Sequence, residues 1–185
     1  MTMHRTLIAV LVAASAAAAP TPAAAQQRFG PSVDASFGLF VGGGGTFEKR
    51  DGPALDGIVA VPLVRTRAAT VVAGVTAGIS GPVVMDRICG PNALCVPNYP
   101  EFVTAGAVAG VQRALGGGLS ARVLAGPAYF QATDGGDTMG MQGRLDVAAP
   151  VIARLAIVAA VRGSLLRYEG EALRFATFGF GLRIQ

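Results

Sequence analysis

Tryptophan is absent from the 185-residue sequence, lysine and histidine occur once each, and there are only two cysteines. The scarcity of lysine and the presence of 26 glycines argue against helices rich in Ala, Leu, Glu and Lys. A net charge of +4 at pH 7 is too small an excess to indicate nucleic-acid binding, so we expect no such partner. The sequence is instead apolar, with 52% hydrophobic and 14% charged residues. So few charged residues would leave a protein in water with a surface that is not polar enough.

Residues 1–25 have the parts of a secretory signal peptide. A short basic start precedes an apolar run of about 13 residues from Leu7 to Ala19, and small alanines end the segment. This run is shorter than the roughly 20 residues that a membrane-spanning helix needs, so we expect cleavage before Gln26 rather than a permanent anchor. The remainder, 26–185, is long enough for one domain.

Both cysteines lie in one short stretch, Cys89 and Cys95, with a Gly-Pro-Asn turn sequence between them. In an oxidising compartment, cysteines this close in sequence favour a local disulfide. Closing so small a loop stabilises the fold by about 2 kcal/mol on the chain-entropy estimate. A metal site is the alternative, but two thiolates need further ligands and residues 26–185 contain no histidine. We therefore predict the disulfide, and we predict no metal and no cofactor.

The last nine residues alternate in polarity with the period of a β-strand. Apolar side chains from Phe178 to Ile184 alternate with small or polar ones from Thr177 to Gln185. Seven earlier segments show the same period, with an apolar face opposite a face of small residues and a few charges. The predicted strands are 32–41, 55–61, 68–80, 102–112, 119–131, 139–149, 155–165 and 172–185.

The connections between these segments alternate between long and short, which is typical of an up-and-down barrel with two unlike ends. An even number of strands returns both termini to one end, where we expect the short turns. The run Gly42–Gly45 is interpreted as a flexible hairpin loop, because no Gly-Lys-Ser/Thr ending supports a phosphate-binding loop. Long connections are predicted at 42–54, 81–101, 132–138 and 167–171, and short ones at 62–67, 113–118 and 150–154.

The composition of the second face indicates a barrel with lipid outside and a polar lumen inside. A soluble barrel needs an outer face polar enough for water, whereas this face is mostly Gly, Ala, Ser and Thr. Small side chains suit a narrow eight-stranded interior, where they leave room for a few long polar ones. Five apolar residues in the inward phase favour the alternative, a soluble periplasmic barrel that binds a hydrophobic ligand: Val72, Val108, Leu124, Phe130 and Val158.

With its export signal, eight alternating segments and amphipathic last strand, the chain resembles the small eight-stranded outer-membrane barrels of the OmpA and OmpX type over residues 26–185. The resemblance implies an all-β, eight-stranded antiparallel up-and-down transmembrane β-barrel in the bacterial outer membrane, in contact with its lipid. It also implies that the outer-membrane assembly machinery recognises the C-terminal strand. Such strands usually end in an aromatic residue, whereas this chain ends with Ile184 and Gln185.

The phase of the alternation places seven charged residues inside the barrel. Charges buried in a lumen need partners. Asp34 and Arg183 lie on the first and last strands, which are neighbours in a closed barrel, so we predict that they pair near the end that holds the termini. Arg122 and Asp146 on the fifth and sixth strands are a second predicted pair. The seven residues are Asp34, Asp56, Arg122, Arg144, Asp146, Arg162 and Arg183.

Two of these residues, Arg144 and Arg162, point into one region and repel each other unless water or an acid intervenes. The seven charges are interpreted as a structural ion network that plugs the barrel, and the alternative is a gated pore or a ligand pocket. An eight-stranded interior is barely wide enough for side chains, which disfavours the pore. Four further arginines lie in or beside the short turns and either contact lipid phosphates or are ordinary solvated charges: Arg65, Arg67, Arg113 and Arg154.

The sequence offers no candidate catalytic residues. Barrels of similar size that acylate or deacylate lipids use a histidine with a serine, and the only histidine here, His4, lies in the predicted signal. No other pair of nucleophile and base is present in the pattern, so we predict no enzymatic activity. The expected role is structural or one of surface interaction, with the loop at 81–101 as the contact surface. A narrow channel or carrier for small molecules is the alternative.

Overall fold

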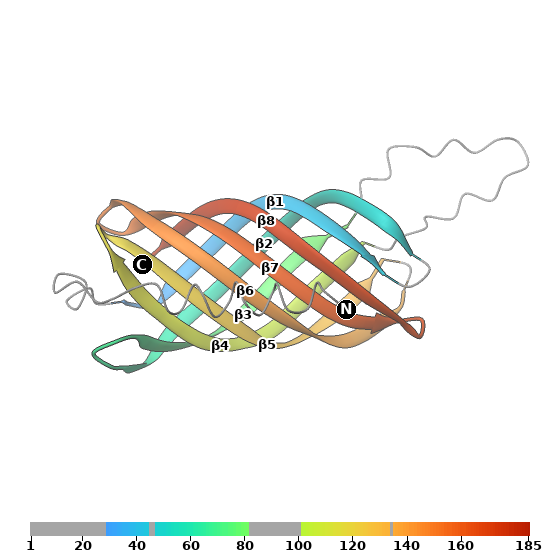
Figure 1. The fold of residues 1–185 in the computed structure, drawn as a ribbon, viewed down its shortest axis with the longest axis horizontal. Helices are drawn as coiled ribbons and strands as arrows, with labels where there is room; N and C mark the ends of the chain where they lie inside the picture. The colour runs from blue at the N-terminus through green and yellow to red at the C-terminus, as the bar shows by residue number, and fades with distance from the viewer. Residues whose placement is uncertain (1–28, 45–46, 82–100, 134) are drawn as a thin grey trace, which may run out of the picture.

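Eight antiparallel strands, each hydrogen-bonded to its neighbours, close into a barrel (Figure 1). The structure is a computed structural model that describes residues 29–44, 47–81, 101–133 and 135–185. Among these residues, no helix is long and apolar enough to cross a membrane. The predicted all-β, eight-stranded up-and-down barrel is confirmed. The strands are β1 (Ser32–Gly44), β2 (Phe47–Arg65), β3 (Thr70–Ser80), β4 (Phe102–Gly116), β5 (Leu119–Ala132), β6 (Asp137–Ile152), β7 (Leu155–Tyr168) and β8 (Glu171–Ile184).

Two predictions fall on parts of the chain outside the described residues. The signal peptide was predicted at residues 1–25, and the disulfide was predicted between Cys89 and Cys95. Both stay predictions.

The strands are longer than the alternation predicts, and the predicted long connections at 42–54, 132–138 and 167–171 are wrong, because the last two shorten to 133–136 and 169–170. β1 continues to Gly44 and β2 begins at Phe47, so only residues 45–46 separate them. The first three glycines of Gly42–Gly45 therefore lie in a strand and not in a loop. Backbone hydrogen bonds between strands do not require side chains of alternating polarity, so the strands continue beyond the residues at which the alternation stops. Strands predicted from alternation are therefore too short. The other segments between strands are 66–69, 81–101, 117–118, 133–136, 153–154 and 169–170.

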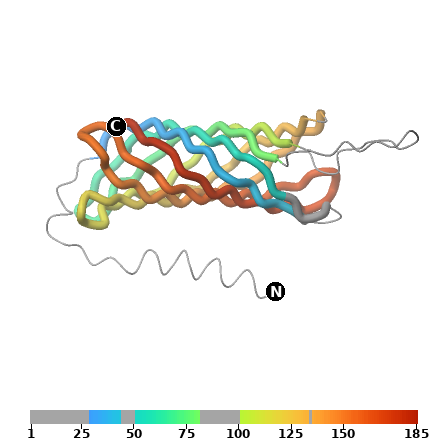
Figure 2. Tube along the Cα trace, turned by 90° about the horizontal axis from the view of Figure 1, so that it is seen from above, coloured from blue at the N-terminus to red at the C-terminus, as the bar shows by residue number. Residues whose placement is uncertain are grey.

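Pairing of β1 with β8 closes the ladder and leaves the sheet without a free edge. The register runs from Val33 opposite Ile184 to Gly43 opposite Arg174. The chain ends at the same end of the barrel as β1 starts (Figure 2), and we define this as the proximal end. The opposite end is defined as the distal end. The proximal end carries the connections 66–69, 117–118 and 153–154, and the distal end carries 45–46, 81–101, 133–136 and 169–170.

Large apolar side chains cover the outer surface on all eight strands. Phe180 is 73% exposed and Phe37 is 66% exposed, whereas Phe40, on the opposite face of β1 from Phe37, is fully buried. The shortest strand has 11 residues, against the roughly 9–11 that a tilted strand needs to cross the hydrocarbon of a bilayer. The outward direction of the apolar side chains is compatible with lipid around the barrel and not with a barrel whose outer surface is exposed to water.

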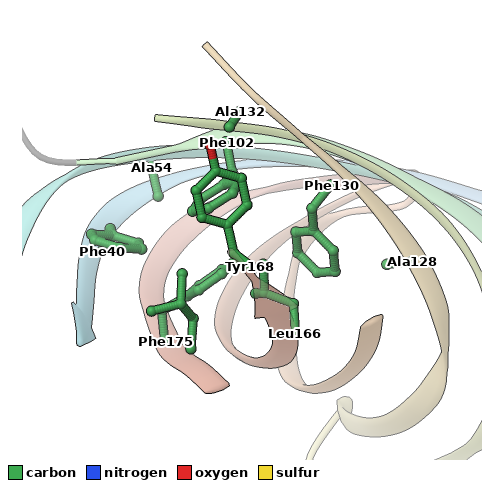
Figure 3. Close-up of a cluster of buried hydrophobic side chains, with 10 residues drawn as sticks. Phe40, Ala54, Phe102, Ala128, Phe130, Ala132, Leu166, Tyr168 and Phe175 are labelled. Atoms are coloured by element: carbon green, nitrogen blue, oxygen red, sulfur yellow. The ribbon is translucent and has the colours of Figure 1, made fainter. Parts of the chain in front are cut away.

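The distal part of the lumen is filled by buried apolar side chains that we define as the aromatic cluster (Figure 3). The ring of Phe102 stacks on Phe175 with centroids 6.0 Å apart and meets Tyr168 edge-on at 5.5 Å. Phe130 meets Phe175 edge-on at 5.7 Å. Such pairs contribute about 0.5–1.5 kcal/mol each beyond their burial. The cluster consists of Phe40, Ala54, Phe102, Ala128, Phe130, Ala132, Leu166, Tyr168, Leu173 and Phe175.

The apolar residues of the inward phase all lie in the lumen, where none is more than 4% exposed. Phe130 belongs to the aromatic cluster. Val72, Val108 and Leu124 form a second cluster with two apolar residues of β2, and Val158 lies in a third, small cluster with three alanines. They pack between the walls of a narrow barrel, so their inward phase is compatible with a lipid-facing exterior.

Glycines allow β1 and β8 to approach closely on the lumen side of their seam. A Cβ added at Gly38 would collide with the backbone carbonyl of Phe178, and one at Gly181 would collide with that of Ala35. On the outer face, Phe37 lies opposite Phe180 in the same ladder. The seam therefore combines a close backbone approach inside with a cross-strand aromatic pair outside.

Replacing Phe102 by alanine is expected to lower the free energy of unfolding by about 3–5 kcal/mol, because packed rings enclose the cavity that it leaves. Phe180→Ala on the outer face should cost about 1.5–3 kcal/mol, since lipid or detergent closes around the shortened side chain. Urea unfolding of the detergent-folded barrel, followed by electrophoretic mobility without boiling, measures both variants. Equal losses would contradict a closely packed aromatic cluster.

Candidate functional site

The seven charged residues assigned to the lumen by alternation are all buried, and none is more than 7% exposed. They come from six strands, β1, β2, β5, β6, β7 and β8. In each case the side chain belongs to the inward face of its strand, where neighbouring inward residues are also buried. The structure brings the seven into contact in two groups, which are described in turn.

Asp34, Arg122, Asp146 and Arg183 form one hydrogen-bonded group, defined as the proximal cluster. Arg183 donates to Asp34 twice, from Nε to Oδ1 at 2.9 Å and from Nη2 to Oδ2 at 2.8 Å. Arg122 donates to Oδ2 of Asp146 from Nε at 2.8 Å and from Nη2 at 2.5 Å. Arg122 Nη2 also donates to Oδ2 of Asp34, and Arg183 Nη2 donates to Oδ2 of Asp146 at 3.2 Å. Each carboxylate of the proximal cluster therefore binds both arginines.

Strand register accounts for two of these contacts, and the narrow lumen accounts for the others. Asp34 lies opposite Arg183 in the β1–β8 ladder, and Arg122 lies opposite Asp146 in the β5–β6 ladder. These are the two pairs predicted from the sequence. β1 and β5 are not neighbours, yet Arg122 reaches Asp34 and also donates from Nη1 to the hydroxyl of Ser32 at 3.2 Å. Alternation assigns a residue to a face and not to a partner on the opposite wall, so the sequence did not indicate this contact.

The second group joins Arg162 on β7 to Asp56 on β2. Arg162 Nη1 lies 2.5 Å from Oδ1 of Asp56, and Thr177 donates its hydroxyl to Oδ2 of Asp56 at 3.3 Å. The guanidinium reaches the opposite wall, where a Cβ added at Gly78 would lie 3.0 Å from Arg162 Nη1. β2 and β7 share no hydrogen-bonded edge, so no sequence pattern indicated this pair.

Arg144 is linked to the proximal cluster through Asp146, two residues further along β6. Its Nε donates to Oδ1 of Asp146 at 2.6 Å. Arg144 also lies opposite Arg162 in the β6–β7 ladder, so these two like charges are cross-strand neighbours. Each contacts a different acid: Arg162 contacts Asp56, and Arg144 contacts Asp146, which also binds Arg122 and Arg183.

The chemistry of these groups is electrostatic. Removing a charge from water costs several kcal/mol, and pairing offsets this cost only when the contacts are close and hydrogen-bonded. Cross-lumen pairs such as Arg122–Asp34 connect walls that the backbone ladder does not connect. Within the described ranges, no group of three or more His, Cys, Asp or Glu is placed to hold a metal ion.

The arginines beside the proximal turns differ in their surroundings. Arg65 donates from Nη2 to the backbone carbonyl of Phe29 at 2.7 Å, which ties the start of the described chain to the end of β2. Arg67 and Arg154 are exposed, and Arg113 is partly exposed. Contact of these side chains with lipid phosphates stays a prediction.

Asp34→Asn is expected to lower the free energy of unfolding by about 3–5 kcal/mol, because it removes one of the negative charges that balance the buried arginines. Asp137→Asn is the matched control, since Asp137 is exposed and accepts one hydrogen bond, from Tyr129 at 2.9 Å. We expect the control to change stability by at most about 1 kcal/mol. Urea midpoints of the two folded variants measure the difference, and similar midpoints would rule out a stabilising role for the proximal cluster.

No protein-family model and no curated protein matches the sequence. Among solved structures, the barrel is similar to Neisserial surface protein A, with a TM-score of 0.55 and 12% identity over 84% of this chain and 97% of that one. It is also similar to Ail, the attachment invasion locus protein of Yersinia pestis, solved alone and with the heparin analogue sucrose octasulfate. Both Ail structures have a TM-score of 0.46 and 12% identity, covering 84% of this chain and all of Ail. The chain therefore has the fold of the small eight-stranded outer-membrane β-barrels.

Proposed function

We propose that the protein is a non-enzymatic outer-membrane β-barrel with a structural or surface-interaction role. The observation that carries this proposal is the filled lumen. The proximal cluster occupies the lumen on the proximal side, the Arg162–Asp56 pair occupies its middle, and the aromatic cluster occupies its distal end. Side chains packed in this way support a scaffold that presents its ends rather than a path through its centre.

The outer surface supports the proposed location. Exposed apolar side chains on every strand need an apolar surrounding, and strands of 11 or more residues match the hydrocarbon thickness. The fold shared with Neisserial surface protein A, an outer-membrane barrel, adds support. The predicted signal at 1–25 supplies export, and its cleavage before Gln26 is part of the proposal. In this orientation the proximal end faces the periplasm and the distal end faces the cell exterior.

The last strand supplies the proposed contact with the outer-membrane assembly machinery. Phe178, Phe180 and Leu182 are each at least half exposed on the outer face of β8. These apolar residues alternate with small or polar ones, so the strand is amphipathic. The resemblance to OmpA-type and OmpX-type barrels implies that the assembly machinery recognises a strand of this kind. Since β8 also closes the barrel against β1, its insertion is coupled to completion of the sheet.

The distal end supplies the proposed contact surface. It carries the longest segment between strands, 81–101, in which the predicted disulfide would join Cys89 and Cys95. Connections at the end of a rigid barrel can vary in sequence without disturbing the lumen, and such loops commonly carry binding function. A shallow hollow at the distal end, between the connections 133–136 and 169–170, is lined by Gly136, Asp137, Tyr168 and Glu169.

Cell fractionation and electrophoresis test the location. We expect the protein in the outer-membrane fraction, and we expect the detergent-folded protein to migrate differently with and without boiling, because a closed barrel resists unfolding by detergent. A soluble periplasmic protein whose mobility does not depend on heating would refute the membrane proposal. Mass determination of the exported protein on the same material tests cleavage before Gln26.

Planar-bilayer recording tests the role of the lumen. The folded protein is expected to produce no stable conductance steps above the bare bilayer, because charged and aromatic side chains fill the interior. A porin reconstituted in the same bilayers provides the positive control. Reproducible unitary steps would replace the scaffold proposal with the narrow channel.

A further inference from the structure

The lumen contains more positive than negative charge. Four arginines and three aspartates of the described residues are buried there, which leaves one positive charge in excess. The proximal cluster by itself is balanced, with two arginines and two aspartates. The excess therefore arises at Arg144 and Arg162, because Arg162 pairs with Asp56 whereas the acid that Arg144 binds, Asp146, is already shared with Arg122 and Arg183.

Arg144 and Arg162 are placed where their charges act on each other. They are directly opposite in the β6–β7 ladder, a position in which Cβ atoms lie about 4.5–5.5 Å apart. Arg144 is 3% exposed and Arg162 is 2% exposed, so water screens neither charge efficiently. Two buried arginines at directly opposite cross-strand positions are stabilised by a negative group near both side chains.

The same two guanidinium groups carry unused hydrogen-bond donors. Among the described residues, Arg162 Nε and Nη2 and Arg144 Nη2 donate no hydrogen bond to another group. Arg162 Nη1 is the nitrogen that pairs with Asp56. Buried donors that carry positive charge are costly to leave unpaired, more so than neutral ones.

The next cross-strand pair adds polar groups to this region. Gln142 lies opposite Ser164 on the same two strands, and both are at least 97% buried, at 3% and 2% exposure. Gln142 Nε2 donates to the hydroxyl of Thr76 at 2.7 Å, whereas its Oε1 has no described partner. The Ser164 hydroxyl likewise has no described partner and can donate to an acceptor beside the arginines.

We propose that the lumen binds one small monovalent anion, of the size of chloride or bromide, between the side chains of Arg144 and Arg162. One such anion balances the excess charge and accepts hydrogen bonds from both guanidinium groups and from Ser164. The narrow lumen favours a small anion, and because the aromatic cluster and the proximal cluster fill the lumen on either side, the anion is enclosed as the barrel folds. This site is independent of the proposed surface role.

Crystals of the folded protein grown in sodium bromide test the site directly. We expect an anomalous bromide peak in contact with the guanidinium nitrogens of Arg144 and Arg162. A dataset in which bromide peaks occur on the protein surface and none occurs between these arginines would overturn the proposal.

Stability in solution gives a second test. At constant ionic strength, replacing sodium isethionate by sodium bromide is expected to raise the urea midpoint, because an anion that binds only the folded state stabilises it. Gln142→Glu places a carboxylate beside the two arginines and should weaken the apparent bromide affinity at least tenfold while raising the midpoint without bromide. Gln131→Glu is the matched control, since Gln131 is exposed, and it should keep the full response.

The two outcomes of this titration are distinct. An unchanged bromide response in Gln142→Glu, or no response in the unmodified protein, would overturn the proposal. Should the variant not fold, the bromide peak in crystals of the unmodified protein decides the matter.

Discussion

Closure of the hydrogen-bond ladder between β1 and β8 is the constraint on which the rest of this structure depends. Backbone groups in hydrocarbon have no water to bind, so a sheet is stable there only when it has no edge. Eight strands complete such a ring, and the interior that they enclose is wide enough for side chains alone. This width explains why so many inward positions hold glycine, alanine, serine or threonine. It also explains why a few long side chains are sufficient to fill the remainder.

The same closure couples strand register to electrostatics. The register that joins β1 to β8 places Asp34 beside Arg183, so the residues that complete the sheet also begin the proximal cluster. Arg122 and Asp146 then connect this seam to β5 and β6 on another part of the wall. The contact of Arg122 with Asp34 and that of Arg183 with Asp146 cross the lumen, where the backbone makes no link. In a medium of low dielectric constant, each such pair is strong and each unbalanced charge is costly.

The aromatic cluster fills the distal level of the lumen, whereas the charged side chains lie below it among smaller apolar clusters, and this difference separates the two ends of the barrel. The aromatic cluster lies beneath the distal connections, where ring packing provides rigidity without charge. Towards the proximal end, the arginines and aspartates bind one another, apart from the excess charge near Arg144 and Arg162. With the interior occupied, the exterior contacts lipid and the ends are free to differ. The proposed surface role at the distal end is compatible with this packing, which disfavours transport through the lumen.

By itself, the sequence determined the number of strands, the face of each residue and the set of charges in the lumen. It could do so because side-chain direction in a strand follows parity alone, so Asp34 and Arg183 are assigned inward without knowledge of the fold. The sequence did not determine where the strands end, because backbone pairing between β1 and β2 continues past the residues at which polar and apolar side chains stop alternating. Only the tertiary structure decided that Arg122 binds Asp34 and that Arg162 binds Asp56. Those partners depend on the stagger and diameter of the closed barrel, which are properties of the whole ring of strands and not of any local pattern.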